Sequence, residues 1–271
     1  MNWIGPHIKR WFTGVIAVPV LFAIIFYGSE ALFSILIILF ILGAVTEYNR
    51  MVFDGGYSWE KGEGLAIALL IPLAVHGGDL QLVLAVVTFS ISGAFFIFLL
   101  RIKDHPIDIT PVGKVVLGAM YIPLMMSHFI LIRHLENGKL WVFFILVLVF
   151  SSDISSFYVG RVWGKRKLIP LVSPGKTLAG AIGSFAGAVT GCILFERFFF
   201  PDLSPLHAIT LGFGGSIFGQ LGDLCESLIK RSSGVKDSGF MMPGHGGVLD
   251  RVDSLIFTIP FVYYYHLFVF R

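Results

Sequence analysis

The chain has 271 residues, of which 56% are hydrophobic and only 14% are charged, and its mean hydropathy is +0.84. A water-soluble domain cannot hide that much apolar surface, so the composition excludes an ordinary soluble protein and indicates a polytopic membrane protein. The formal net charge of +3 says little about partners, and no nucleic-acid partner is expected.

Long apolar runs predict an all-α fold with about nine transmembrane helices. In chain order the runs cover 11–28, 31–47, 64–77, 80–100, 113–132, 140–160, 178–197, 206–229 and 252–270. Runs 140–160 and 206–229 differ from the other apolar runs because polar residues occur in their C-terminal halves. We expect one compact membrane domain, in which 1–110 supply about four spans and 111–271 carry the functional site.

Basic residues are distributed unequally between the two sides of this nine-span arrangement. The side that holds the N-terminus and the loops 161–177 and 230–251 carries 16 of the 20 Lys and Arg residues. Because positively charged loops stay in the cytoplasm, the N-terminus and both loops are predicted to be cytoplasmic. The expected location is the cell's inner (plasma) membrane, which the chain crosses several times.

The first polar region lies between Ser151 and Thr177. Asp153 falls inside an apolar run, where an ionised carboxylate is costly, so it is predicted to face a polar cavity or a cation. Five basic residues follow it: Arg161, Lys165, Arg166, Lys167 and Lys176. The segment SPGKT resembles the end of a phosphate-binding P-loop, but the required glycine spacing is absent and we reject that interpretation.

The second polar region is the end of run 206–229. Asp223 and Glu226 are three residues apart, so they share one face of a helix. Lys230 follows Glu226 by four residues and extends the same stripe, where it can neutralise one of the acids. The pattern therefore fits either an internal salt bridge or a cation site.

The third polar region is the glycine-rich stretch 243–247 and the helix that it precedes. A glycine-rich turn that enters a helix offers free backbone N–H groups, which suit phosphate oxygens. Asp250 and Asp253 again lie three residues apart on one face of that helix.

Acidic and basic residues thus converge on one predicted membrane surface. Carboxylates suit Mg²⁺, and Lys and Arg suit phosphate oxygens, so both together indicate a metal-assisted reaction on phosphates. The sequence has no obvious Cys and His cluster, which favours a hard cation over zinc.

The stretch from Ser227 to Ser254, SLIKRSSGVKDSGFMMPGHGGVLDRVDS, resembles the signature of the phosphatidate cytidylyltransferase (CDP-diacylglycerol synthase) family. Positions in register are Ser227, Lys230, Arg231, Lys236, Asp237, His245, Gly246, Gly247, Asp250, Arg251 and Asp253. SPGKTLAG also resembles a family segment, but Gly175 and Ala179 replace a lysine and a glutamate. The resemblance covers roughly 140–270.

The resemblance implies that CMP passes from CTP to phosphatidate, giving CDP-diacylglycerol and diphosphate, with Mg²⁺ as cofactor. Asp223 and Asp250 are then the principal metal ligands, and Asp253 and Glu226 supplementary ones. The predicted catalytic set is Asp223, Asp250, Lys230, Lys236 and Arg251, and the predicted substrate-binding set is Arg231, His245, Gly246, Gly247, Asp153 and Lys176. A second cation and a homodimer are left open.

Three other functions compete with this interpretation. A CTP-dependent polyprenol or phytol kinase would share the nucleotide and lipid site. A proton- or cation-coupled secondary transporter could use the intramembrane acids. An intramembrane aspartyl protease would need two membrane aspartates, such as Asp153 and Asp223, but would leave the basic loops and the glycine-rich turn unexplained.

Overall fold

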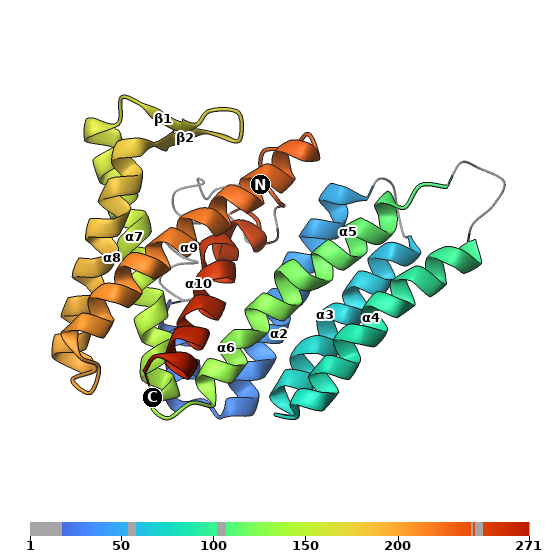
Figure 1. Ribbon diagram of the computed structural model, residues 1–271, viewed down its shortest axis with the longest axis horizontal. Helices are drawn as coiled ribbons and strands as arrows, with labels where there is room; N and C mark the ends of the chain where they lie inside the picture. The colour runs from blue at the N-terminus through green and yellow to red at the C-terminus, as the bar shows by residue number, and fades with distance from the viewer. Residues whose placement is uncertain (1–17, 54–57, 102–106, 240, 242–245, 271) are drawn as a thin grey trace, which may run out of the picture. The chain divides into compact units, whose positions relative to one another are not determined.

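The computed structural model describes residues 18–53, 58–101, 107–239, 241 and 246–270 (Figure 1). A helix over Val18–Tyr27 comes first. The other elements are α2 (Glu30–Val52), α3 (Trp59–His76), α4 (Leu80–Arg101), α5 (Thr110–Ala119), the π-helical turn η1 (Met120–Leu124), α6 (Met125–Arg133), α7 (Gly138–Trp163), β1 (Lys167–Ile169), β2 (Ser173–Thr177), α8 (Leu178–Phe199), α9 (Pro205–Ser232) and α10 (Leu249–Phe268).

The predicted all-α membrane fold is confirmed, with one short hairpin added. Among the described residues, five helical segments are long and apolar enough to cross a membrane: α2, α4, the continuous stretch Thr110–Arg133, α7 and α8. Only Ala94 is fully buried along α4, and more than half of the residues of this apolar helix are exposed and available to lipid. The figure of nine spans stays a prediction.

The described chain forms two compact units. Unit 1 comprises Met1–Leu131 with Asp237–Leu249, and unit 2 comprises Ile132–Lys236 with Asp250–Arg271. The signature stretch is therefore divided, because its glycine-rich part belongs to unit 1 and its flanks belong to unit 2. The predicted division of the membrane segments at residue 110 stays a prediction.

In unit 1, polar contacts fix α2 against its neighbours. The hydroxyl of Tyr48 donates a hydrogen bond to the carbonyl of Lys114 on α5 (2.8 Å), and Ser34 pairs with His76 on α3 (2.9 Å). Ser29 precedes helix α2, and its side chain accepts a hydrogen bond from the N–H of Leu32 and caps the helix. Two buried polar side chains of α2, Tyr48 and Ser34, thus find their partners on neighbouring helices.

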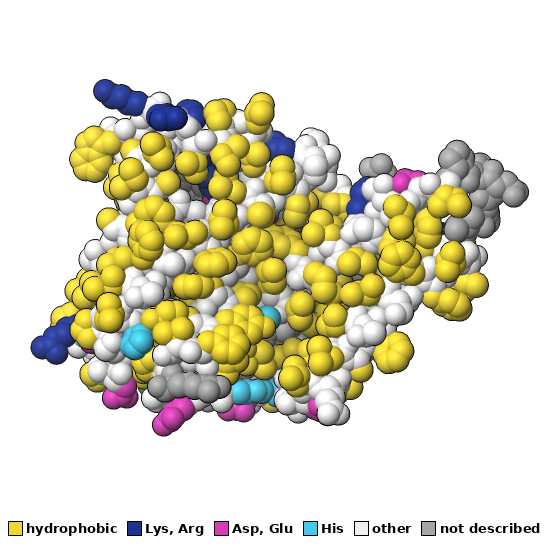
Figure 2. Space-filling view, viewed as in Figure 1, with side chains coloured by type: hydrophobic (Ala, Val, Ile, Leu, Met, Phe, Trp, Pro, Cys, Tyr) yellow, Lys and Arg dark blue, Asp and Glu magenta, His cyan; other side chains and the backbone are white. Residues whose placement is uncertain are grey.

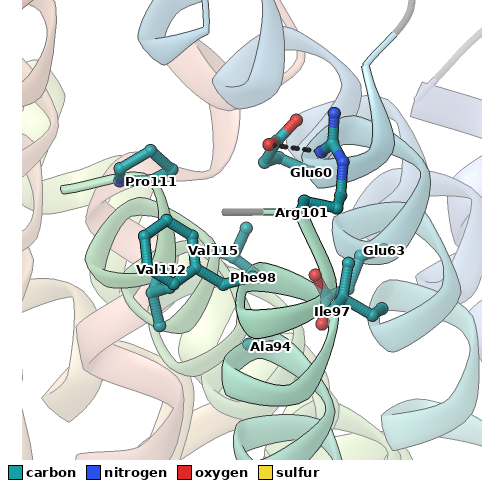
Figure 3. A pocket seen from close by; sticks show the side chains of 9 residues that line it. All are labelled: Glu60, Glu63, Ala94, Ile97, Phe98, Arg101, Pro111, Val112 and Val115. Atoms are coloured by element: carbon teal, nitrogen blue, oxygen red, sulfur yellow. Dashed lines mark hydrogen bonds and ion pairs between the residues drawn. The ribbon is translucent and has the colours of Figure 1, made fainter. Parts of the chain in front are cut away.

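A cavity of about 160 Å³ lies between α3, α4 and α5 of unit 1 (Figure 3). Its charged end holds the Glu60–Arg101 ion pair (2.8 Å) with Glu63 nearby, and apolar side chains such as Phe98 and Val112 line the rest. This ion pair joins the start of α3 to the end of α4, so these two helix ends lie side by side. The cavity contains none of the predicted site residues.

In unit 2, small residues bring α7, α8 and α9 close together. A Cβ atom added at Gly187 of α8 would collide with Ser155 of α7. Three buried hydroxyls, of Ser152, Ser184 and Ser216, hydrogen-bond one another at 2.5, 3.1 and 2.9 Å, with one hydroxyl from each helix. The small residues of α8 thus allow the three helices to pack closely.

Between α7 and α8 the chain forms a two-stranded antiparallel hairpin, where the sequence predicted only a loop. Lys167 pairs with Thr177 and Ile169 pairs with Ser173. The side chain of Thr177 accepts a hydrogen bond from the N–H of Gly180 (3.1 Å) and caps α8. The segment SPGKT is therefore strand β2 leading into a capped helix.

Candidate active site

Three carboxylates from two helices of unit 2 meet in one cluster. Ligand oxygens of Asp223 and Glu226 on α9 and of Asp253 on α10 all lie within 4.8 Å of one another. The spacing of three residues puts the first two acids on one helix face, as predicted. The backbone of α10 approaches very closely, because a Cβ at Gly222 would collide with the carbonyl oxygen of Asp253. A glycine before Asp223 thus allows the second helix to supply its acid.

Two lysines contact this cluster from different directions. The ammonium of Lys176, on β2, lies 2.7 Å from Oδ2 of Asp223. The ammonium of Lys230 lies 2.5 Å from Oε2 of Glu226 and 2.7 Å from Oδ1 of Asp250. Lys230 therefore links α9 to α10, and Glu226 is the acid of the stripe that it neutralises. Asp250 lies outside the three-acid cluster among the described residues and is held by Lys230 instead.

Asp153 of α7 adds a fifth acid to this region. It interacts electrostatically with Asp223 and Lys176, and it also acts on Asp253. Its side chain is exposed in the protein, so the cluster has an open side there. The sequence predicted that Asp153 faces a polar cavity or a cation, and its neighbours are the acid cluster and a lysine.

Among the described residues of this arrangement, carboxylates outnumber the ammonium groups that contact them. Five carboxylates stand against the two ammonium groups that contact them in the described part of unit 2, which leaves three negative charges when all are ionised. Oxygen donors of this kind suit a hard divalent cation, and the cluster contains no sulfur or imidazole donor among the described residues. The donor set therefore fits a divalent metal.

The remaining predicted residues are placed as follows. Arg231 donates hydrogen bonds to the carbonyls of Val172 and Val235, at 3.2 and 3.0 Å. Lys236 and Arg251 are exposed. His245 lies outside the described residues. Gly246 has φ of +84°, a conformation that favours glycine, and Gly247 is buried in unit 1.

Sequence reasoning missed Glu47, a fully buried acid of unit 1. Its Oε2 accepts hydrogen bonds from the hydroxyl of Ser238 (3.0 Å) and from the N–H of Leu249, the first residue of α10 (2.9 Å). A Cβ at Gly239 or Gly247 would lie 2.6 Å from this carboxylate. One side chain of α2 thus binds residues on both sides of the glycine-rich stretch. An acid at the end of the apolar run 31–47 was the available signal, under the reasoning that singled out Asp153.

Comparison with known proteins identifies the family of this chain. The model of the cytidylyltransferase family matches residues 8–269, nearly the whole chain. The chain belongs to the cytidylyltransferase family. The match includes the first half of the chain, beyond the resemblance at 140–270, and it therefore covers Glu47 as well as the acid cluster.

Individual relatives match over shorter regions. A phosphatidate cytidylyltransferase of Bacillus subtilis (strain 168) is 41% identical over 154 residues, which are 56% of this chain and 57% of the relative. One of Haemophilus influenzae is 42% identical over 137 residues, 49% of this chain and 48% of the relative. An uncharacterized protein, YnbB, of Escherichia coli (strain K12) is 44% identical over 132 residues, 49% of this chain and 44% of the relative. The chain spans about half the length of the curated relatives it matches.

Proposed function

We propose that this membrane protein transfers CMP from CTP to phosphatidate, giving CDP-diacylglycerol and diphosphate. The observation that carries the proposal is the cluster of Asp223, Glu226 and Asp253 with its lysines, which lies within the region that the cytidylyltransferase family model matches. Relatives named phosphatidate cytidylyltransferase, at 41% and 42% identity, support this choice of substrates.

The chemical obstacle is repulsion between two anions. An oxygen of the lipid phosphate bonds to the α-phosphorus of CTP while the bond from that phosphorus to the bridging β-phosphate oxygen breaks, and diphosphate leaves. The attacking oxygen already carries negative charge, so no strong general base is needed. Fixed positive groups that screen and align the two phosphates therefore supply most of the catalysis.

The residues of the site divide this work. Asp223, Glu226 and Asp253 would hold a divalent metal, proposed to be Mg²⁺, and Asp250 stays a predicted fourth ligand. When bound, the metal would supply positive charge against the phosphate oxygens of the nucleotide. Lys176 and Lys230 keep the carboxylates in place and offer cationic N–H groups to phosphate. Lys236, Arg231 and Arg251 are proposed to bind the triphosphate or the lipid phosphate, and a role for Asp153 on the nucleotide side is proposed with them.

The proposal includes the side of the membrane that the site faces. Lys176, Arg231 and Lys236 come from the loops predicted to be cytoplasmic, so the site is proposed to face the cytoplasm, where CTP is available. The proposed location is the inner (plasma) membrane. Acyl chains would remain in the bilayer while the phosphate of the lipid reaches the interface.

The test uses the purified full-length chain with phosphatidate, Mg²⁺ and CTP labelled in the α-phosphate or in the γ-phosphate. Transfer of CMP puts the α-label into lipid and leaves the γ-label in diphosphate, and a chelator stops the transfer until Mg²⁺ is restored. Lipid that carries the γ-label would instead identify a CTP-dependent lipid kinase and overturn the proposal. Cation uptake by liposomes without any lipid product would identify a transporter.

A further inference from the structure

The hairpin β1–β2 carries a surface that the reaction does not use. It connects the end of α7 to the start of α8, two helices that are each able to cross a membrane. Figure 1 shows the hairpin running across the ends of these helices and not along their axes. With α7 and α8 crossing the bilayer, a segment in that position would lie along the membrane surface, where both helices leave the bilayer.

The tip of the hairpin exposes apolar side chains. Leu171 at the turn is 92% exposed, and Ile169 at the end of β1 is 40% exposed. Aromatic residues of the last turns of α7, Tyr158 and Trp163, are 62% and 67% exposed. Trp and Tyr gather at membrane–water interfaces, so these two rings mark the interface beside the hairpin. An apolar tip at that depth is suited to contact with lipid.

The base of the hairpin is strongly basic. Arg161, Lys165, Arg166 and Lys167 give four positive charges within seven residues, and all four side chains are exposed. The sequence contains no Asp or Glu between Asp153 and Glu196. Figure 2 shows Lys and Arg side chains next to hydrophobic ones at this end of the molecule. A surface with basic and apolar residues side by side is complementary to anionic lipid headgroups above acyl chains.

The hairpin is firmly attached to the acid cluster. Lys176 of β2 forms the ion pair with Asp223, and Arg231 of α9 donates to the carbonyl of Val172 in the turn. The N–H of Leu178 donates to the carbonyl of Arg166 (2.9 Å), which closes the base of the hairpin. A lipid bound at the hairpin would therefore lie on an element that also supports the site.

We propose that the hairpin is an interfacial lipid-binding element. Leu171 and Ile169 insert among the acyl chains, and Lys165, Arg166 and Lys167 bind the phosphates of anionic phospholipids. Binding of anionic lipid is independent of the reaction. Its consequence, a higher local concentration of phosphatidate at the site, rests on the proposed function.

The insertion is tested by a spin label at Leu171→Cys, in a Cys225→Ser background, with the protein in nanodiscs that contain anionic phospholipid. The control label is at Ser232→Cys, an exposed position at the end of α9. We expect the label at 171 to be more accessible to oxygen than to a water-soluble nickel chelate, and the label at 232 to show the reverse. A label at 171 that is accessible mainly to the nickel chelate would overturn the proposal. The apolar tip would then face water, where a soluble partner could bind it.

The headgroup part is tested by replacing Lys165, Arg166 and Lys167 together with Gln and assaying turnover in mixed micelles. A basic residue near an anionic surface contributes a factor of about five, so the KM for phosphatidate as a surface fraction should rise at least tenfold. The KM for CTP and kcat should stay unchanged, and Leu171→Met should behave like the natural chain. An unchanged KM for phosphatidate would refute headgroup binding. Absence of turnover in the natural chain would refute only the proposed function, because the spin-label result does not depend on activity.

Discussion

Two fully buried glutamates, Glu47 in unit 1 and Glu226 in unit 2, are stabilised in different ways. Both side chains are 0% exposed. Glu47 accepts hydrogen bonds from a hydroxyl and a backbone N–H, and it forms no salt bridge with a described residue. Glu226 contacts the ammonium of Lys230 and lies with two further acids. Neutral hydrogen-bond donors hold Glu47, which therefore has a structural role. Glu226 lies among several acids, and this excess of negative charge favours binding of a cation.

The largest effect should come from removing a carboxylate of the cluster. Asp223→Asn and Asp253→Asn keep the size of the side chain but remove a negative charge, and we expect CMP transfer to fall by about 10²–10³-fold. Asp202→Asn, at an exposed acid between α8 and α9, is the matched control and should leave turnover unchanged. Near-normal turnover of the cluster variants, measured on folded purified protein, would contradict a cation role for this cluster.

Lys230→Met should have the next largest effect. It removes the cation shared by Glu226 and Asp250, which leaves a buried carboxylate without its partner. Loss of one member of a buried ion pair costs about 3–5 kcal/mol, so thermal unfolding in detergent should shift to clearly lower temperature. Addition of Mg²⁺ should restore part of that loss, because the cation replaces the missing positive charge. Equal stability of the natural chain and the variant would show that Lys230 is dispensable to the cluster.

Glu47→Gln should act on the glycine-rich stretch and not on metal affinity. The amide is a weaker acceptor for Ser238 and Leu249, so we expect a loss of about 1–3 kcal/mol in stability. Amide hydrogen exchange over 237–249 should become faster, while the dependence of turnover on Mg²⁺ concentration should keep its midpoint. A shifted Mg²⁺ midpoint would show that Glu47 contributes to metal binding, as the acids of the cluster are expected to do.

The smallest effect should come from the neutral network of unit 2. Ser184→Ala removes one of three buried hydroxyls that bond one another and should cost about 1 kcal/mol. Turnover per folded molecule should stay unchanged, because no charge is altered. A loss of turnover at unchanged stability would assign this network to the site.

The sequence predicted most helices because long apolar runs indicate membrane segments without knowledge of their partners. It also placed Asp223, Glu226 and Lys230 on one stripe, since spacing along a single helix is local information. It could not show that Asp253 joins this stripe while Asp250 is held by Lys230, because the packing of α9 on α10 decides that. The hairpin was missed because SPGKT contains proline and glycine, which are typical of turns.

The hydrogen bonds of Glu47 join residues that are 191 and 202 positions apart in the chain. At about 5–20 residues per second, a ribosome needs roughly 10–40 s to make the donors after it has made the acceptor. During that interval α2 carries an acid whose partners do not yet exist. Completion of unit 1 therefore waits for the last part of translation, and a nascent chain that stops before Ser238 keeps a carboxylate without its native donors.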